Sequence, residues 1–378
     1  MCDVTDDPID LVLVTGAGAS REFGVNRTNL PLMAEWSASL LRKLREVPGF
    51  ADAVGLQDGM TGPAFEDRLG VFLGAAEAFP RIKTLVEPLG KMLSATAPAT
   101  IGGNLNNSWD AWHGQAQFQL EQVFGRIYES LYENFEAPQY DPGLVQGAYA
   151  ALLTQLGINE NAKWVYATTN YDVIADAAIQ ALGGSFDDGT YTARFGGGSE
   201  RHFRVAGLLQ GVGRDIPLLH LHGRVGWLIR PGTGRGTGPY AIDHHVRWES
   251  TMGIPLVMLP DPAKDPQRGN PIIGEMWAVF RDALRRARRV LVLGHSLHDV
   301  PLIEALAENV SGGRLAVTLL GESDSGELAD DAQRVEKTLE ESLPNAHRVI
   351  MRFGPGYGPG PSYSLREWIN ATNSAPIT

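Results

Sequence analysis

The sequence predicts an α/β fold, a parallel sheet with helices on both faces and a large helical insertion. Two observations lead to this expectation. In the second half of the chain, short apolar runs alternate with helical segments, which is the pattern of a parallel sheet covered on both faces. Between the first apolar run and the second, helical periodicity dominates for much longer than one crossover helix requires. We therefore expect an α/β domain at 1–32 and 161–378, and a helical subdomain at 33–160.

Short apolar runs that end in turn residues predict the strands. These runs begin at Leu11, Trp164, Ile216, Val290 and Leu315, and a weaker run at 347–353 predicts a last strand. Apolar residues that recur at helical spacing predict the helices. The helical segments are 33–47, 111–135, 173–184, 275–289, 300–310 and about 328–342.

The composition excludes several classes of protein. A net charge of −12 argues against electrostatic capture of nucleic acid, which requires a basic face. Cys2 is the only cysteine of the sequence, so neither an intrachain disulfide nor a cysteine-based zinc site can form. The acidic N-terminus lacks the basic start of a secretory signal, and no apolar run approaches the ~20 residues of a membrane span. We expect a soluble cytoplasmic protein that binds neither membrane nor nucleic acid.

The turn after the first strand reads GAGAS and predicts a phosphate-binding turn, but not that of a dehydrogenase. Gly16 and Gly18 fit the first two positions of the G-x-G-x-x-G pattern, whereas Arg21 holds the third. No acidic residue stands at the end of a second strand about 20 residues on. The glycines let the backbone come close to a ligand, and N–H groups at a helix start attract phosphate.

Unusual polar clusters follow the other strands as well. They are TTNYD with Asn170 and Asp172, HLHG with His220 and His222, GHSLHD with Gly294, Ser296 and Asp299, and GES at 321–323. Single clusters of this kind are typical of turns, although histidine is not a common turn residue. Because the carboxyl ends of parallel strands face the same way, we expect these clusters to converge at one edge of the sheet, where α/β proteins bind ligands.

GAGAS, TTNYD, LHLHG and LVLGHSLHD, in this order, resemble the sirtuin superfamily, and more closely the zinc-free sirtuin-like NAD hydrolase domains of bacterial antiphage defence systems. The resemblance implies a Rossmann-like fold that binds NAD as its substrate, with no zinc. It also implies the roles of the residues. Asn170 and Asp172 would lie beside the nicotinamide ribose, and His222 would be the catalytic histidine. The remaining NAD contacts would be Gly16, Ala17, Gly18 and Ser20 at the phosphates and ribose, Gly294, Ser296 and Asp299 along the adenosine, and Gly321 and Glu322 at its ribose.

The resemblance implies cleavage of the nicotinamide–ribose bond, which NAD hydrolases and NAD-dependent protein deacylases share. His222 would be the general base, Asn170 would orient the ribose or the attacking water, and Asp172 would stabilise the developing positive charge. Deacylases of this superfamily usually carry a four-cysteine zinc module, which this chain cannot form, so we favour an NAD hydrolase over a deacylase. A role in antiphage defence, a homo-oligomer and a separately encoded partner such as a HerA-type ATPase also follow from the resemblance.

Two other interpretations stay open from the sequence. The pair His220 and His222 could chelate a metal from one face of a strand, with further ligands from Asp243, His244, His245, His295 and His298. Alternatively, the fold could bind NAD or a derivative without turnover and regulate a partner. The presence of both Asn170 and His222 favours catalysis, because a sensor does not require the base.

Overall fold

The computed structural model describes residues 7–20, 23, 33–57, 60, 64–65, 68–69, 115, 118–120, 122–136, 140–195, 198–230, 238–241, 254–258, 271–295, 297, 299–310, 314–318, 337, 340–342 and 349–350. Everything said below about the structure concerns these residues. No helix among them is both long and apolar enough to cross a membrane.

A seven-stranded sheet forms the centre of the molecule, in the order β12-β11-β10-β1-β2-β6-β3. Every neighbouring pair in it is parallel, which confirms the predicted parallel sheet. All six strands expected from the apolar runs belong to it, and the short β3 is an addition. The strands are β1 (Leu11–Thr15), β2 (Trp164–Thr168), β3 (Phe186–Asp187), β6 (Ile216–His220), β10 (Val290–Leu293), β11 (Leu315–Thr318) and β12 (Val349–Ile350).

The order of the strands reverses at β1. The next strand of this sheet along the chain, β2, pairs with one side of β1, and β10 pairs with the other side in the register Val12↔Val290. After β1 the chain continues toward one edge of the sheet, and after β10 it continues toward the other edge. The turns that follow these two neighbouring strands therefore diverge. Such a switch point, at the carboxyl ends of the strands, is where open α/β sheets bind ligands.

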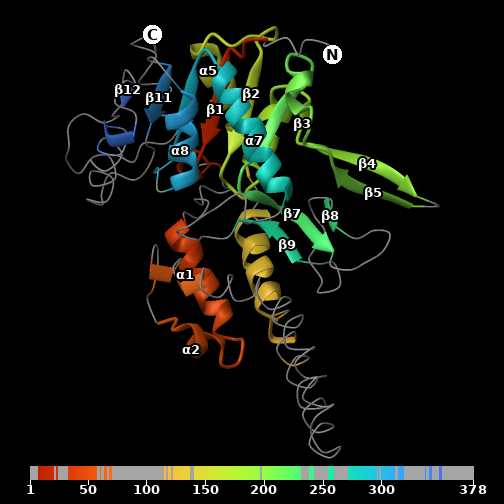
Figure 1. Cartoon of the computed structure of the whole chain (residues 1–378), viewed down its shortest axis with the longest axis vertical. Coiled ribbons are helices and arrows are strands. Elements are labelled where there is room, and N and C mark those ends of the chain that lie inside the picture. The colour runs from red at the N-terminus through yellow and green to blue at the C-terminus, as the bar shows by residue number, and fades with distance from the viewer. Residues whose placement is uncertain are drawn as a thin grey trace, which may run out of the picture.

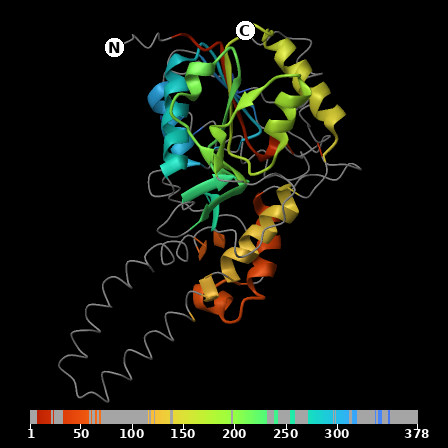
Figure 2. The same ribbon diagram turned by 90° about the vertical axis from the view of Figure 1, so that its right-hand side faces the viewer.

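Helices cover both faces of this sheet, and Figure 2 shows the strands between the two helical layers. Along β1, Leu11 and Leu13 pack with α5 (Pro142–Gln155) and α6 (Ile174–Ala181), whereas Val12 and Val14 pack with α7 (Pro271–Arg286) and α8 (Val300–Asn309). Because successive residues of a strand point to opposite faces, a strand buried on both sides is apolar throughout. This is why the strands are visible in the sequence as continuous apolar runs.

The helix α5 lies within the range 33–160 expected for the helical subdomain, but it packs against the parallel sheet. Its start is fixed by Asp141, whose side chain accepts hydrogen bonds from the amides of Gly143 and Leu144 at 2.9 and 3.2 Å. Pro142 follows directly as the first helical residue, where its missing N–H is not required. The backbone amide of Asp141 also donates to the carbonyl of Phe23, which links α5 to the segment after β1.

A second, antiparallel sheet of five strands was not expected from the sequence. Its order is β4-β5-β8-β7-β9, and Figure 1 shows the β4–β5 hairpin extending away from the parallel sheet. The hairpin strands read TYTARF and GSERHF, and neither contains the apolar run by which the other strands were recognised. The strands are β4 (Thr190–Phe195), β5 (Gly198–Phe203), β7 (Gly223–Arg230), β8 (Gly238–Ala241) and β9 (Ile254–Val257).

A helical layer lies beyond the carboxyl ends of the parallel strands, as Figure 1 shows for α1 and α2. It comprises α1 (Met33–Leu44), α2 (Phe50–Val54), the helical residues 122–131 and the π-helical turn η4 (Tyr132–Glu136). Trp36, Leu40, Ile127 and Leu131 are fully buried in its own apolar core. The helical subdomain expected from the sequence is therefore present in the described part of 33–136, and it is positioned over the predicted ligand-binding edge.

Candidate functional site

Four of the polar turns predicted to converge do meet at the carboxyl edge of the parallel sheet. They follow β1, β2, β6 and β10, and each contacts the next in a closed ring. The turn after β1 contacts those after β2 and β10, and the turn after β6 contacts those after β2 and β10 in the same way. The fifth cluster, with Gly321 and Glu322, lies outside the described residues, as does Ser296.

Asn170 connects the turn after β2 with the turn after β1. Its side-chain amide donates to the hydroxyl of Ser20 at 2.8 Å and to the carbonyl of Gly16 at 3.1 Å. Its own backbone amide donates to the Thr168 hydroxyl, so the turn is fixed from both sides. Asn170 is 7% exposed and thus lies at the inner limit of what a ligand can reach. With both amide hydrogens directed to the protein, Oδ1 is the atom that can accept a hydrogen bond from a ligand.

The turns after β1 and β10 touch each other through glycines. A Cβ on Gly16 would lie 2.7 Å from the carbonyl oxygen of Gly294, and a Cβ on Gly294 would lie 2.3 Å from the amide nitrogen of Ala19. Gly294 also has a φ of +63°, which side chains rarely adopt. The amides of Gly16, Gly18, Ala19 and Ser20 all donate to protein carbonyls. The glycines are thus required for contact between turns, and their expected approach to NAD phosphates stays a prediction.

His222 lies at the start of the turn after β6 and is hydrogen-bonded to Asp299. The contact joins Nε2 of the imidazole to Oδ2 of the carboxylate, and both side chains are at most 5% exposed. The other carboxylate oxygen of Asp299 accepts from the amide of Leu302 and caps the start of α8. An ionised carboxylate only accepts hydrogen bonds, so with Asp299 ionised the contact requires the proton on Nε2 and leaves Nδ1 as the basic nitrogen.

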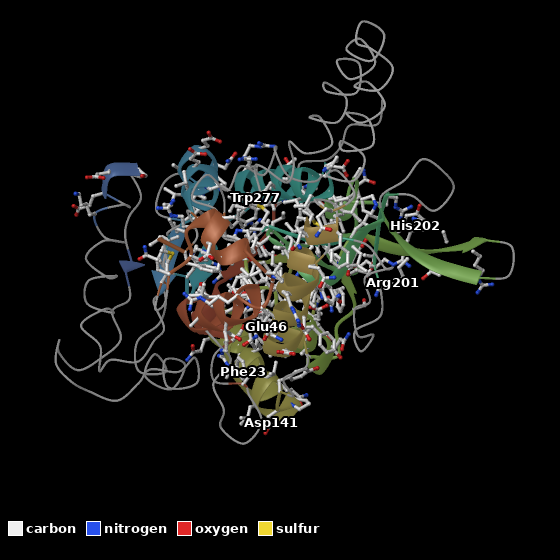
Figure 3. The ribbon with its side chains drawn as sticks, turned by 90° about the horizontal axis from the view of Figure 1, so that it is seen from below. Phe23, Glu46, Asp141, Arg201, His202 and Trp277 are labelled. Carbon is white, nitrogen blue, oxygen red and sulfur yellow. The ribbon has the colours of Figure 1, made fainter. Side chains whose placement is uncertain are left out.

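The position of His222 is fixed further by its neighbours. The preceding carbonyl, that of Leu221, accepts from the indole N–H of Trp277 at 2.8 Å, and the amide of Leu221 donates to the Thr168 carbonyl. The His222 carbonyl accepts from the amide of Met258 at 2.7 Å. Figure 3 shows Trp277, on α7, on the side of the molecule opposite Asp141 at the start of α5.

Tyr171 lies between Asn170 and Asp172 and joins this turn to the helical layer. Its ring packs against Trp36 of α1 and Phe135 of η4, with centroids 5.7 Å away in both cases. Its hydroxyl donates to the carbonyl of Met258, the residue that also holds the His222 carbonyl. The helical layer is therefore anchored directly at the site, a connection that the sequence did not reveal.

Asp172 is a buried acid whose carboxyl has a raised pKa. Burial raises the pKa of its carboxyl from 3.8 to about 6, in spite of hydrogen bonds from the Ile174 amide, Ser20 and Asn170 that favour the ionised form. The negative charge of Asp176, one helical turn further along, adds to the increase. At neutral pH the Asp172 carboxyl is therefore mostly ionised, and a small decrease in pH protonates it.

The resemblance assigns Asp299 to the adenosine side of NAD, and this role stays a prediction. In the structure its carboxylate contacts His222 and the first turn of α8. The sequence signal was present, because an Asp directly before Val-Pro is typical of a helix N-cap. That pattern does not indicate that the Asp299 carboxylate contacts His222.

The pair His220 and His222 does not form a chelate. His220 lies 3.6 Å from Asp176 of α6, while His222 contacts Asp299 of α8 on the other side of the sheet. Among the described residues, no group of three possible ligands could hold a metal ion. Asp243, His244, His245 and His298 lie outside these residues, and His295 accepts from the amide of Leu297 through Nδ1 at 2.9 Å.

Comparison with known proteins adds no assignment. No family model matches the chain, and no curated protein does. Among solved structures, "Structure of Sir2Tm bound to a propionylated peptide" aligns over 100% of this chain and 97% of that one, at 11% identity and a TM-score of 0.35. "Sir2 bound to acetylated peptide" aligns over the same shares, at 11% identity and a TM-score of 0.37. Similarity at these values decides neither fold nor function, and both are inferred from this chain's own residues.

We predict that Gly294→Ala destabilises the protein far more than Gly157→Ala. Both glycines have a similar positive φ, of +63° and +65°, but a Cβ meets backbone only at Gly294. The left-handed conformation alone costs about 1–2 kcal/mol, and overlap with the Ala19 amide adds to this at Gly294. Urea unfolding of the two variants measures the difference, and equal losses of stability would show that the two turns are not in tight contact.

We predict that Asp172→Asn stabilises the protein at neutral pH. A carboxyl whose pKa rises to about 6 on folding contributes stability below pH 4, and this contribution is lost as the pH rises through 6. The amide is free of this penalty, so the free energy of unfolding should increase at pH 8 by up to about 3 kcal/mol. Urea unfolding of both proteins between pH 4.5 and 8 measures the difference. A difference that widens toward low pH would contradict the shifted pKa.

Proposed function

We propose that this chain is an NAD hydrolase of the sirtuin-like type, which cleaves the nicotinamide–ribose bond of NAD to give nicotinamide and ADP-ribose. One observation carries the proposal. Asn170 and His222, each fixed by protein partners, lie on adjacent turns at the carboxyl edge of a parallel sheet, next to its switch point. An oriented amide and an oriented imidazole at this place match the requirements of cleavage at a ribose carbon.

The departure of nicotinamide requires no acid. The ring carries a positive charge while it is bound to the ribose, and it leaves as a neutral molecule. The difficulty lies in the oxocarbenium-like ribose that develops, which a fixed negative charge stabilises. Asp172 supplies such a charge when it is ionised, because it is buried behind Asn170 and Ser20 and cannot be screened by bulk water.

His222 takes up the proton that the reaction releases. Water that adds to the ribose carbon must lose a proton, and Nδ1 of His222 accepts it while Asp299 holds Nε2. The carboxylate fixes the orientation of the imidazole and stabilises its protonated form, as a carboxylate partner does for a catalytic histidine in general. Oδ1 of Asn170 orients a ribose hydroxyl or the attacking water by accepting a hydrogen bond.

Hydrolysis is favoured over deacylation because it requires only water as the second substrate. The four-cysteine zinc module that is usual in sirtuin deacylases has no counterpart in a sequence whose only cysteine is Cys2. Deacylation is the second candidate, since the same first bond breaks in both reactions. An effector role in antiphage defence, assembly into a homo-oligomer and activation by a HerA-type partner extend the proposal.

We predict that the purified protein releases nicotinamide from NAD without any peptide. Asn170→Ala and His222→Ala should each reduce kcat by roughly 10²-fold or more, because each removes a group that acts in the transition state. Nicotinamide release is measured by chromatography with and without an acylated peptide.

The variant Asn159→Ala is the control for this assay, because Asn159 lies in an exposed turn at the opposite edge of the sheet. Turnover only in the presence of the peptide would establish the deacylase instead. Binding of NAD by the wild type with no cleavage under either condition would establish a sensor, once the candidate partner has been added and has changed nothing.

We predict that Asp299→Asn reduces kcat by roughly 10²–10⁴-fold with little loss of stability. Asn is as good an N-cap as Asp, so α8 keeps its start, while the negative charge that orients His222 is lost. Asp141→Asn makes the same change at the N-cap of α5, where the carboxylate accepts from the amides of Gly143 and Leu144, and should leave kcat unchanged. Thermal unfolding and steady-state kinetics of both variants test this, and an unaltered kcat in Asp299→Asn would remove Asp299 from the mechanism.

A further inference from the structure

Three charged or titratable side chains are buried together beneath the site, and the proposed reaction uses none of them. Asp176, His220 and Arg224 have side-chain exposures of 4%, 0% and 3%. A guanidinium nitrogen of Arg224 lies 3.1 Å from one carboxylate oxygen of Asp176, and Nε2 of His220 lies 3.6 Å from the other. We refer to these three residues as the buried ion cluster.

The buried ion cluster connects the two chain segments that carry the proposed catalytic residues. Asp176 lies in the first turn of α6, directly after the turn that holds Asn170 and Asp172. His220 and Arg224 stand two residues before and two residues after His222. A single carboxylate is therefore contacted by both flanks of the histidine turn, and it lies in the helix that directly follows the asparagine turn.

The three members of the buried ion cluster lie in different surroundings. The imidazole of His220 packs edge-on against the indole of Trp227, with centroids 5.3 Å apart. Asp176 is near the N-terminus of α6, where the helix dipole favours a negative charge. Arg224 is the second residue of β7, directly after Gly223, which pairs with Val257 of β9. The cluster thus joins α6, the end of β6 and the start of β7, which are three separate elements around the site.

Stability alone does not account for charges at this place. Removing two charges from water costs free energy, which offsets much of their mutual attraction. Apolar residues of similar size therefore often stabilise a protein equally well or better. A buried ion pair does differ from an apolar contact in that separating its two charges leaves each of them uncompensated in the interior, which is strongly destabilising. That property is useful where two catalytic groups must keep a fixed separation, since a misplacement of about 1 Å can reduce a rate 10²-fold.

We infer that Asp176, Arg224 and His220 act as positioning residues, which hold the Asn170 turn and the His222 turn at the separation that the reaction requires. They contact neither substrate nor reacting atoms in this role. The inference rests on the proposed function for its catalytic consequence, whereas its structural part, the coupling of the two turns, is testable without any activity.

The test replaces the ion pair by apolar residues of similar size, in Asp176→Leu/Arg224→Met, so that no charge is left without its counter-ion. Hydrogen exchange measured by mass spectrometry should accelerate about tenfold or more in two segments, 168–174 and 219–223, which contain the amides of Asn170, Ile174 and Leu221. Exchange in β10 and β11 should stay the same. In the NAD assay, kcat should fall about 100-fold, with a KM within about threefold of the wild type.

The matched control is Asp188→Leu/Arg201→Met, which removes a partly buried pair 3.6 Å apart at the β4–β5 hairpin. Figure 3 shows Arg201 on that hairpin. This variant should alter exchange only in the hairpin and leave kcat unchanged. Arg224→Lys keeps the charge but loses the planar fork, so it retains the fold and should show a smaller acceleration in the same two segments.

The outcomes separate the two proposals. Unchanged exchange of 168–174 and 219–223 in both the double variant and Arg224→Lys overturns the positioning role. Accelerated exchange with an unchanged kcat overturns its importance for the reaction. If the wild type binds NAD but does not cleave it, the proposed function fails, and the exchange data alone still decide whether the buried ion cluster couples the two turns.

Discussion

The contact between the turns after β1 and β10 is the constraint on which the rest of the site depends. Gly16 and Gly294 approach so closely that a side-chain carbon on either would overlap the other turn, and the amide of Gly18 donates to the carbonyl of Gly294. Parallel strands separate their connections at this point, so without the contact the two halves of the site would be free to move apart. The turn after β1 carries Ser20, which accepts a hydrogen bond from Asn170, and the turn after β10 leads to Asp299.

The second feature that shapes the site is a set of three buried carboxyl groups. Asp172, Asp176 and Asp299 are all at most 5% exposed, and each has partners that compensate the loss of water. Buried carboxylates that lack compensation take up protons instead, and the raised pKa of Asp172 shows how close this one is to that limit. Such an environment strengthens every electrostatic interaction with a bound ligand, because no bulk water intervenes.

The helical layer is part of the site rather than a separate attachment. Tyr171 is packed between Trp36 and Phe135, yet its neighbours along the chain are Asn170 and Asp172. Any displacement of α1 or η4 would therefore act on the residues proposed to contact the ribose.

The sequence by itself determined the parallel sheet and the polar turns that meet at its edge, and the tertiary structure decided how the side chains of those turns are paired. Strands buried on both faces must be apolar throughout, and turns at their carboxyl ends must meet, so the convergence of the turns that carry Asn170, Asp172 and His222 was predictable from local pattern alone. The hairpin β4–β5 was missed because a half-exposed strand such as TYTARF carries no apolar run. The partners of His222, Tyr171 and Asp176 were also not predictable. An acid at a helix start or an arginine after a glycine looks ordinary until long-range packing of α6, α8 and β7 brings it to its counterpart.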